Sequence, residues 1–98
     1  MIELRRTERF DTWLAALRDS QARARILNRM DRLARGNPGD VRPVGEEVSE
    51  LRIDSGPGYR VYYVQHGRGV VILLCGGDKR NQAREIEMAK ALARQLET

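Results

Sequence analysis

The sequence has few of the residues that build disulfides, metal centres or membrane segments. It contains one cysteine, Cys75, and one histidine, His66. A single cysteine excludes an internal disulfide, and the two residues together leave no Cys/His metal site. No run of about 18 apolar residues is present, so no transmembrane helix is expected. The opening MIELRRTERF lacks the apolar stretch of a signal peptide, and we therefore expect a cytoplasmic protein.

Lysine is scarce as well, although the chain is basic. Of 18 basic residues only Lys79 and Lys90 are lysines, which leaves 16 arginines against 14 acidic residues and a net charge of +4. The planar guanidinium fork suits phosphates and stacks on bases. This balance favours nucleic acid or an acidic partner. Codon usage in a GC-rich genome would explain the arginine bias equally well.

The length of 98 residues predicts one domain spanning 1–98, without a cleft between domains. Hydrophobic residues make up 41% of the chain and charged residues 33%. These proportions are typical of a folded chain with a highly charged surface.

The first half of the chain predicts a short strand and then two helices. Residues 1–5 alternate in hydrophobicity as a strand does. Thr7 can cap a first helix and Asp19 or Ser20 a second, which the segment Gly36-Asn37-Pro38-Gly39 ends. The apolar positions at helical spacing are Phe10, Trp13, Leu14 and Leu17, and then Ile26, Leu27, Met30, Leu33 and Ala34.

The second half predicts three strands and a last helix. Residues 40–47 are expected to form a loop that is partly extended. Strands are then expected at 48–53, 59–66 and 70–75, and the continuous apolar run of the third is typical of a central strand. Short turns join them, so they should form an antiparallel meander. Asn81 can cap a final helix with apolar residues at Ile86, Ala89, Leu92, Ala93 and Leu96.

The resulting fold class is α+β with the order β-α-α-β-β-β-α and a small antiparallel sheet. The two adjacent helices should form a hairpin that covers one face of the sheet, because their apolar stripes need a partner. The other face would then be open to a ligand.

Strand alternation sorts the candidate site residues. Val61 and Tyr63 are expected in the core, which places Arg60, Tyr62 and His66 on the open face. Four basic side chains could gather there around a phosphate, namely Arg52, Arg60, Lys79 and Arg80.

Purely structural roles explain the same residues. Glu50 and Arg52 could form ion pairs on a solvated face, and Arg60 could tie a turn to the sheet. The arginines of the second helix are typical of a solvated helix face, or else of an electrostatic footprint on RNA. No phosphate-binding GxxxxGK[ST] loop, Ser-His-Asp set or carboxylate cluster is present. A nuclease built on this chain would therefore work without metal.

Several segments, in this order, resemble one protein family. They are RRTERFDTWLAALRD, GNPGDVRPVGEEV, VSELRID, GPGYRVYYV and LLCGGDKRNQAREIEMAKALA. Together they resemble the toxins of the RelE/ParE superfamily, and within it the HigB-like, phage Gp49-like addiction-module killer proteins. The resemblance covers nearly the whole chain, and the GYR and GGDK segments are specific in combination.

The resemblance implies a RelE-like fold and a bacterial type II toxin without a cofactor. An antitoxin, often a helix-turn-helix protein encoded alongside, would hold it inactive, and operator DNA would be bound only by the toxin–antitoxin complex. RelE-like members cleave mRNA on the ribosome. The matching motifs imply catalytic roles for Arg60, Lys79 and Arg52. RNA contacts are expected from Arg80, Gln82, Tyr62 and His66.

The sequence departs from the family in one respect. Many RelE-like nucleases carry a tyrosine or histidine near the start of the last helix, where this chain reads NQAREIEMAK. Tyr62 or His66 could take the place of that base if the fold brings it near Arg60, and Lys79 could do so if its cationic neighbours favour its neutral form. Two other functions stay open: a ParE-like inhibitor of DNA gyrase that cleaves nothing, and a non-catalytic basic RNA-binding module.

Overall fold

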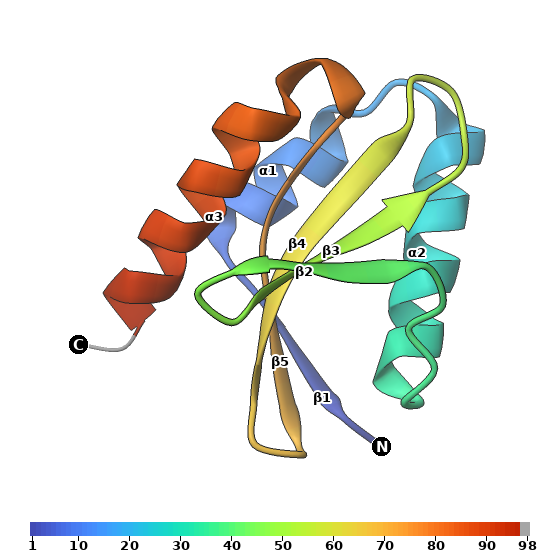
Figure 1. The fold of residues 1–98 in the computed structure, drawn as a ribbon. Helices are drawn as coiled ribbons and strands as arrows, with labels where there is room; N and C mark the ends of the chain where they lie inside the picture. Colours follow the sequence, from blue (N-terminus) through green and yellow to red (C-terminus); the bar gives the residue numbers. More distant parts are fainter. Residues whose placement is uncertain (97–98) are drawn as a thin grey trace.

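The structure is a computed structural model and describes residues 1–96. It confirms the α+β class (Figure 1). In chain order the elements are β1 (Glu3–Arg6), α1 (Glu8–Ala16), α2 (Ser20–Ala34), β2 (Val41–Gly45), β3 (Val48–Ile53), β4 (Tyr59–His66), β5 (Val70–Gly77), the short 3-10 helix η1 (Lys79–Asn81) and α3 (Gln82–Leu96). No helix within this part of the chain is both long and apolar enough to span a membrane.

The predicted starts of all three helices match the structure, but the side chain of Asn81 does not cap α3 as predicted. Thr7 accepts a hydrogen bond from the Phe10 amide, and Asp19 caps α2 in the same way. Asp78 is the N-cap of the 3-10 helix η1, which precedes α3. The side chain of Asn81 instead accepts from the Asp78 amide and closes a capping box around η1, so that α3 begins one residue later.

The segment predicted as a loop at 40–47 contains a strand, so the sheet has five strands. β2 pairs antiparallel with β3, and Glu46 and Glu47 form the turn between them with φ of 52° and 67°. Two residues with positive φ are what a tight hairpin needs, but Asn and Gly are its usual signals. Pro43 is tolerated because β2 is an edge strand. Glu46 is held by a paired contact to Arg94 of α3.

The strand order is β1-β5-β4-β3-β2. The meander of β3, β4 and β5 is antiparallel, as predicted. The first strand was expected in an antiparallel sheet, but β1 runs parallel to β5, with Leu4 opposite Val71. β5 is an interior strand, as its apolar run predicts, and it continues to Gly77.

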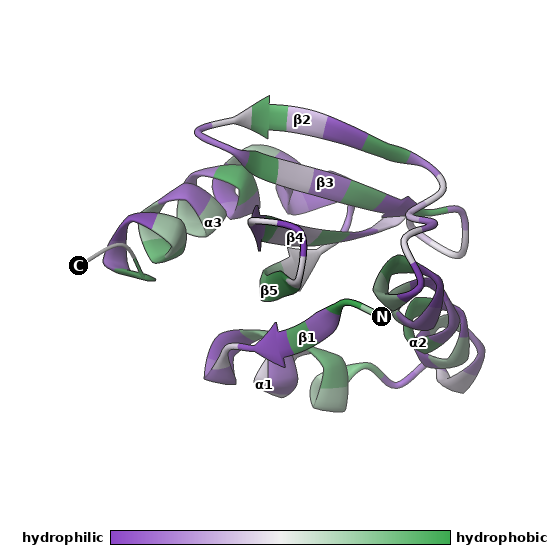
Figure 2. Cartoon of the chain, turned by 90° about the horizontal axis from the view of Figure 1, so that it is seen from below, coloured by the Kyte–Doolittle hydropathy of each residue, from purple (hydrophilic) through white to green (hydrophobic). Residues whose placement is uncertain are grey.

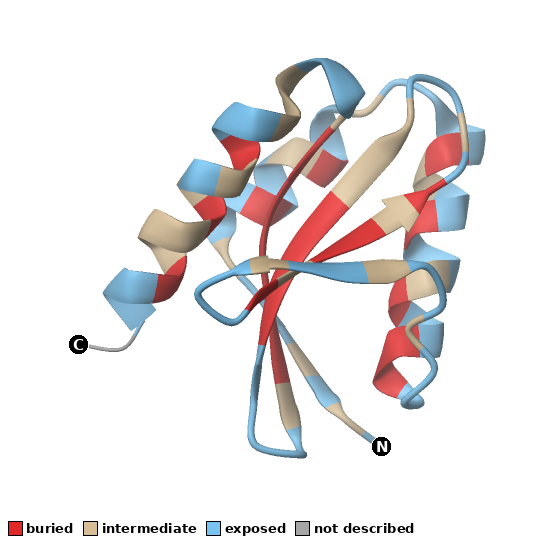
Figure 3. Ribbon diagram, in the orientation of Figure 1, coloured by how far each residue is buried: buried red, intermediate tan, exposed pale blue. Residues whose placement is uncertain are grey.

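Helices cover both faces of the sheet, which corrects the expectation of one open face. Residues of α1 and α2 share one apolar cluster with β3, β4 and β5, while α3 packs over a second cluster on the opposite face. Figure 2 shows α2 and α3 on opposite sides of the twisted sheet. α1 and α2 do not form the predicted hairpin packed along each other, because α1 lies against β5 and α2 against β3. Buried residues therefore line both sides of the central strands (Figure 3).

Candidate functional site

A completely buried carboxylate, that of Glu50 on β3, lies at the centre of the candidate site. Its Oε2 accepts hydrogen bonds from the Tyr62 hydroxyl at 2.9 Å and from Nε2 of Gln82 at 2.8 Å. Its Oε1 accepts from Nε of Arg42 at 3.0 Å and of Arg52 at 3.4 Å. We call these five residues, together with Arg60, the Glu50 cluster.

Sheet register explains why the cluster forms. Glu50 lies opposite Arg42 on β2 and opposite Tyr62 on β4. Arg52 is two residues further along β3, so its side chain lies on the same face as that of Glu50. Arg60 is the β4 partner of Arg52. Three neighbouring strands therefore deliver three guanidinium groups to one face, next to the first turn of α3.

The electrostatics of the cluster favour an ionised carboxylate. Burial alone would raise the pKa of Glu50, but hydrogen bonds from Gln82, Arg42 and Tyr62 outweigh it and the pKa lies below its usual value. One carboxylate faces three arginines, so the cluster is cationic as a whole. Such an excess of fixed donors suits a phosphate group.

Arg60 occupies a constrained position at the edge of the cluster. Its side chain is only 12% exposed, and its Nε lies 3.8 Å from Oε2 of Glu50. That Nε is buried and finds no hydrogen-bond acceptor within residues 1–96, whereas Nη1 donates to the carbonyl of Gly58. Gly58 has φ of +79°, and a Cβ on it would come within 2.9 Å of Arg60 Nη1. The turn and the guanidinium are thus packed against each other.

Lys79 lies at the same turn as Arg60. The position of a Gly58 Cβ would be 3.7 Å from Cβ of Lys79, so the two basic residues lie around the same glycine. Lys79 is exposed at the start of η1. Arg80, the next residue, is 82% exposed and pairs with Asp78 at 2.9 Å. The structure therefore places the Cβ of Lys79 at the turn against which Arg60 packs, and it directs Arg80 to a separate ion pair.

The expected position of Tyr62 is wrong, and His66 is exposed as expected but lies far from Arg60. Tyr62 was expected on an open face but is completely buried. Burial and the neighbouring Glu50 raise the pKa of its hydroxyl, which therefore remains a hydrogen-bond donor and not a base. His66 is exposed at the opposite end of β4, where it pairs with Val70, while Arg60 pairs with Gly77. Six residues of strand separate His66 from Arg60, about 20 Å, so His66 cannot serve as a base there.

Sequence reasoning missed the central role of Glu50 and the participation of Arg42. Glu50 was considered a member of an ion pair on a solvated face, because nothing local showed that α3 would cover it. Arg42 was in the segment predicted as a loop. The signal that could have found them is the strand register, because opposite charges that face each other on neighbouring strands stabilise a sheet.

Arg25 and Arg29 of α2 have structural partners. Arg25 donates to the carbonyl of Asp54, and Arg29 donates to those of Arg52, Pro38 and Asp40. These bonds tie α2 to the ends of β2 and β3, which favours the structural explanation over an RNA footprint.

Cys75 is buried, and its burial raises the pKa of the thiol to about 12, so it is an unreactive core residue. Within residues 1–96 no group of three His, Cys, Asp or Glu side chains could hold a metal ion.

Comparison with known proteins identifies the family. Residues 12–96 match the family described as "Phage derived protein Gp49-like (DUF891)", and the chain belongs to that family. The family is associated with toxin–antitoxin systems. The chain is also similar to an uncharacterized protein of Haemophilus influenzae, with 47% identity over 95 residues that cover 97% of this chain and 96% of the relative.

Proposed function

We propose that this chain is the toxin of a type II toxin–antitoxin system and that it cleaves mRNA bound to the ribosome. The observation that carries the proposal is the convergence of three guanidinium groups, from Arg42, Arg52 and Arg60, on one buried carboxylate. Lys79 adds a further cation at the turn of Gly58, against which Arg60 packs. The association of the family with toxin–antitoxin systems supports the toxin role. The cationic excess of the cluster supports a phosphodiester as substrate.

The proposed reaction is attack of a ribose 2′-oxygen on the adjacent phosphorus. The O2′–P bond forms and the P–O5′ bond breaks, which leaves a 2′,3′-cyclic phosphate and a 5′-hydroxyl. The 2′-hydroxyl proton passes to solvent, and the departing O5′ takes up a proton. Arg60 and Lys79, with Arg52 nearby, stabilise the charge that builds up on the phosphoryl oxygens. One well-placed donor contributes about 3–4 kcal/mol to such a transition state.

The cluster contains no evident general base. The Glu50 carboxylate is fully buried and already accepts four hydrogen bonds, and the Tyr62 hydroxyl stays protonated. Catalysis would therefore depend on charge stabilisation and on alignment of the RNA. Holding the reacting groups in line can supply about 7–11 kcal/mol, which explains why the ribosome would be required.

Glu50 acts in this proposal as a positioning residue. It does not touch the RNA, but its two oxygens fix the guanidinium groups of Arg42 and Arg52 and the amide of Gln82 before the substrate arrives. Preorganised donors need no rearrangement during the reaction, which makes them more effective than mobile ones. The expected antitoxin would inactivate the protein by covering this cationic surface.

The test is expression of the chain alone in bacteria, with mapping of new 5′-hydroxyl transcript ends in the presence and absence of translation. Arg60→Ala should abolish both growth arrest and cleavage. Arg68→Ala removes an exposed arginine from the turn after β4 and should change neither. Inhibition of purified gyrase without new transcript ends would establish the ParE-like alternative. RNA binding with neither effect would establish the non-catalytic one.

A further inference from the structure

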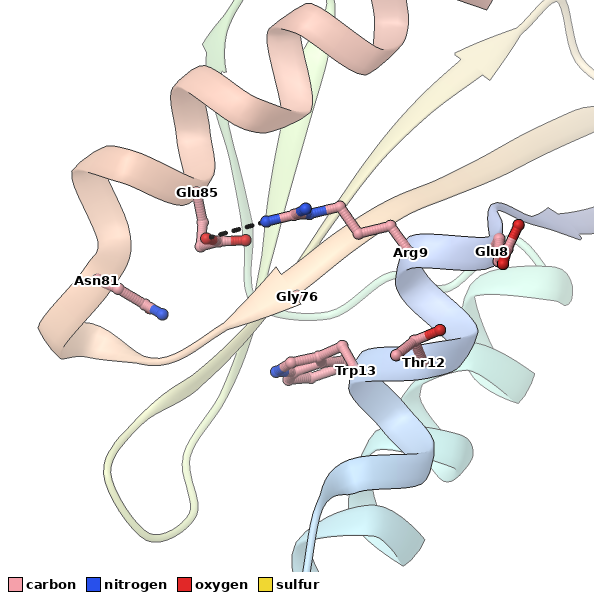
Figure 4. A pocket seen from close by; sticks show the side chains of 7 residues that line it. All are labelled: Glu8, Arg9, Thr12, Trp13, Gly76, Asn81 and Glu85. Atoms are coloured by element: carbon pink, nitrogen blue, oxygen red, sulfur yellow. Dashed lines mark ion pairs between the residues drawn. The ribbon is translucent and has the colours of Figure 1, made fainter.

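A second cavity lies outside the Glu50 cluster, between α1 and α3 and over the end of β5. It measures about 560 Å³, a size typical of sites for small ligands. Figure 4 shows Trp13 on α1 and Glu85 on α3 on its walls, with Gly76 of β5 between them. Asn81 also lines it, one residue before Gln82, which belongs to the cluster.

Two consecutive glycines allow this cavity to form. A Cβ on Gly76 would lie 2.4 Å from Cε3 of Trp13, so the indole packs directly on the strand backbone. A Cβ on Gly77 would lie 2.8 Å from Cγ of Glu85. The indole is held further by Phe10 and Tyr59, at ring-centroid distances of 5.9 and 6.4 Å. An aromatic wall supported in this way is a suitable stacking surface.

Glu85 brings a hydrogen-bond acceptor into the cavity. It is only 5% exposed, yet its nearest cations, Arg9 and Arg84, are each 3.8 Å away, beyond hydrogen-bond distance. In Figure 4 the Arg9 contact spans the space between α1 and α3. A buried carboxylate with only such long contacts can accept two adjacent N–H donors from a ligand.

The rim of the cavity and of an adjoining hollow carries three arginines against two acids, Glu8 and Asp78, and is therefore basic on balance. Arg9, Arg84 and Arg80 are 47%, 77% and 82% exposed, and the last two line an adjoining hollow that shares Asn81 with this cavity. Such a rim repels a cationic peptide side chain but attracts a phosphate. An aromatic wall, a buried acceptor and a basic rim together match a nucleotide.

We propose that this cavity binds a guanine base of the RNA strand, stacked on Trp13 and read by Glu85. Guanine is the common base whose Watson–Crick edge places two neighbouring donors, N1–H and N2–H, opposite a carboxylate. The inference deepens the proposed function and rests on it for the source of the base. Asn81 and Glu85 of the cavity flank Gln82 of the cluster, so the two sites adjoin at the first turn of α3.

Trp13 is the only tryptophan, so its fluorescence reports on the cavity directly. We expect GMP to quench it, and AMP, CMP and UMP to do so at least about tenfold more weakly, since a bidentate base contact discriminates by roughly that factor or more. Glu85→Gln should abolish the preference for GMP, while Arg68→Ala should bind GMP as the wild-type protein does. The indole N–H resonance of the wild-type protein should shift with GMP, a readout that needs no variant.

The outcomes separate this inference from the proposed function. No response to any mononucleotide, or equal responses to all four, would overturn the guanine site even if mRNA cleavage is intact. GMP binding in a protein that cleaves nothing would support the site and reject the nuclease. A short RNA with one guanine should bind at least about tenfold more tightly than GMP, through its added phosphates. Equal affinity would overturn the assignment to RNA in favour of a free guanine nucleotide.

Discussion

The Tyr62 hydroxyl donates a hydrogen bond of 2.9 Å to the Glu50 carboxylate, and both side chains are completely buried. The two residues face each other on β3 and β4. Tyr62 thereby supports the carboxylate from within the sheet, while arginines approach it from the solvent side. This pairing explains why a cationic surface can form around a buried acid.

Replacing Tyr62 by Phe tests this supporting role. Loss of a buried hydrogen bond to a charged group should lower the free energy of unfolding by about 1.5–3 kcal/mol. Growth arrest should persist at a temperature where the variant is folded, because the hydroxyl is a donor and not a base. Urea denaturation and a growth assay measure the two effects. A folded variant without toxicity would show that the hydroxyl takes part in the reaction.

Glu50→Leu should destabilise the protein strongly, because it leaves four hydrogen-bond donors, two of them guanidinium groups, without their shared acceptor. Removing one partner of a buried ion pair costs about 3–5 kcal/mol. We expect a value near 3 kcal/mol, since Arg42 and Arg52 are 49% and 39% exposed and can turn to solvent. Glu3→Leu, at an exposed ion pair, is the control and should change stability by less than about 0.5 kcal/mol. Similar losses for the two variants in urea denaturation would contradict the buried role of Glu50.

Acid should destabilise the protein partly through Glu50. Its pKa is lowered in the folded state, so its contribution to stability is present above the ordinary value of 4.5 and is lost as the pH falls through the folded pKa. Glu50→Gln removes this titration. The free energy of unfolding, measured in urea from neutral pH to about pH 3, should fall less steeply below pH 4.5 for this variant than for the wild type. Parallel curves would show that Glu50 titrates normally.

Gly76→Ala should disturb the cavity between α1 and α3. The new Cβ would meet the Trp13 ring at 2.4 Å, and such overpacking costs about 1–3 kcal/mol. Gly69→Ala, in the turn before β5, is the control, since a Cβ there has nothing within 4 Å. Thermal unfolding and the emission maximum of Trp13 should change for Gly76→Ala and not for Gly69→Ala. An unchanged emission spectrum in both would mean that the indole does not pack on Gly76.

Glu47→Gly should stabilise the protein. Glu47 has φ of 67° in the turn between β2 and β3, a conformation that costs a non-glycine residue about 1 kcal/mol. The gain should be smaller than that because glycine also makes the unfolded chain more flexible. Glu46→Gly relieves a similar strain but breaks the contact with Arg94, so it should be less stable than Glu47→Gly. The melting temperatures of the two variants test this order.

Local patterns in the sequence determined most of the fold. Helix caps at Thr7 and Asp19 and the alternation along 48–53 and 59–66 are short-range signals, and each predicts its element correctly. The motif around Arg60 and Lys79 also indicates a cationic site. The strand β2 was missed because its turn, Glu46-Glu47, lacks the residues that usually signal a hairpin.

Only the tertiary structure decided which side chains share the site. Strand alternation places Glu50 and Tyr62 on one face, but their burial depends on α3, which arrives from a distant part of the chain and covers that face. The same packing places Glu85 against the strand that supports Trp13. His66 shares a strand with Arg60 and still lies about 20 Å away, because an extended chain separates residues that are close in sequence. Side-chain type and period are local properties, whereas the partner of a buried charge is set by the way distant elements pack.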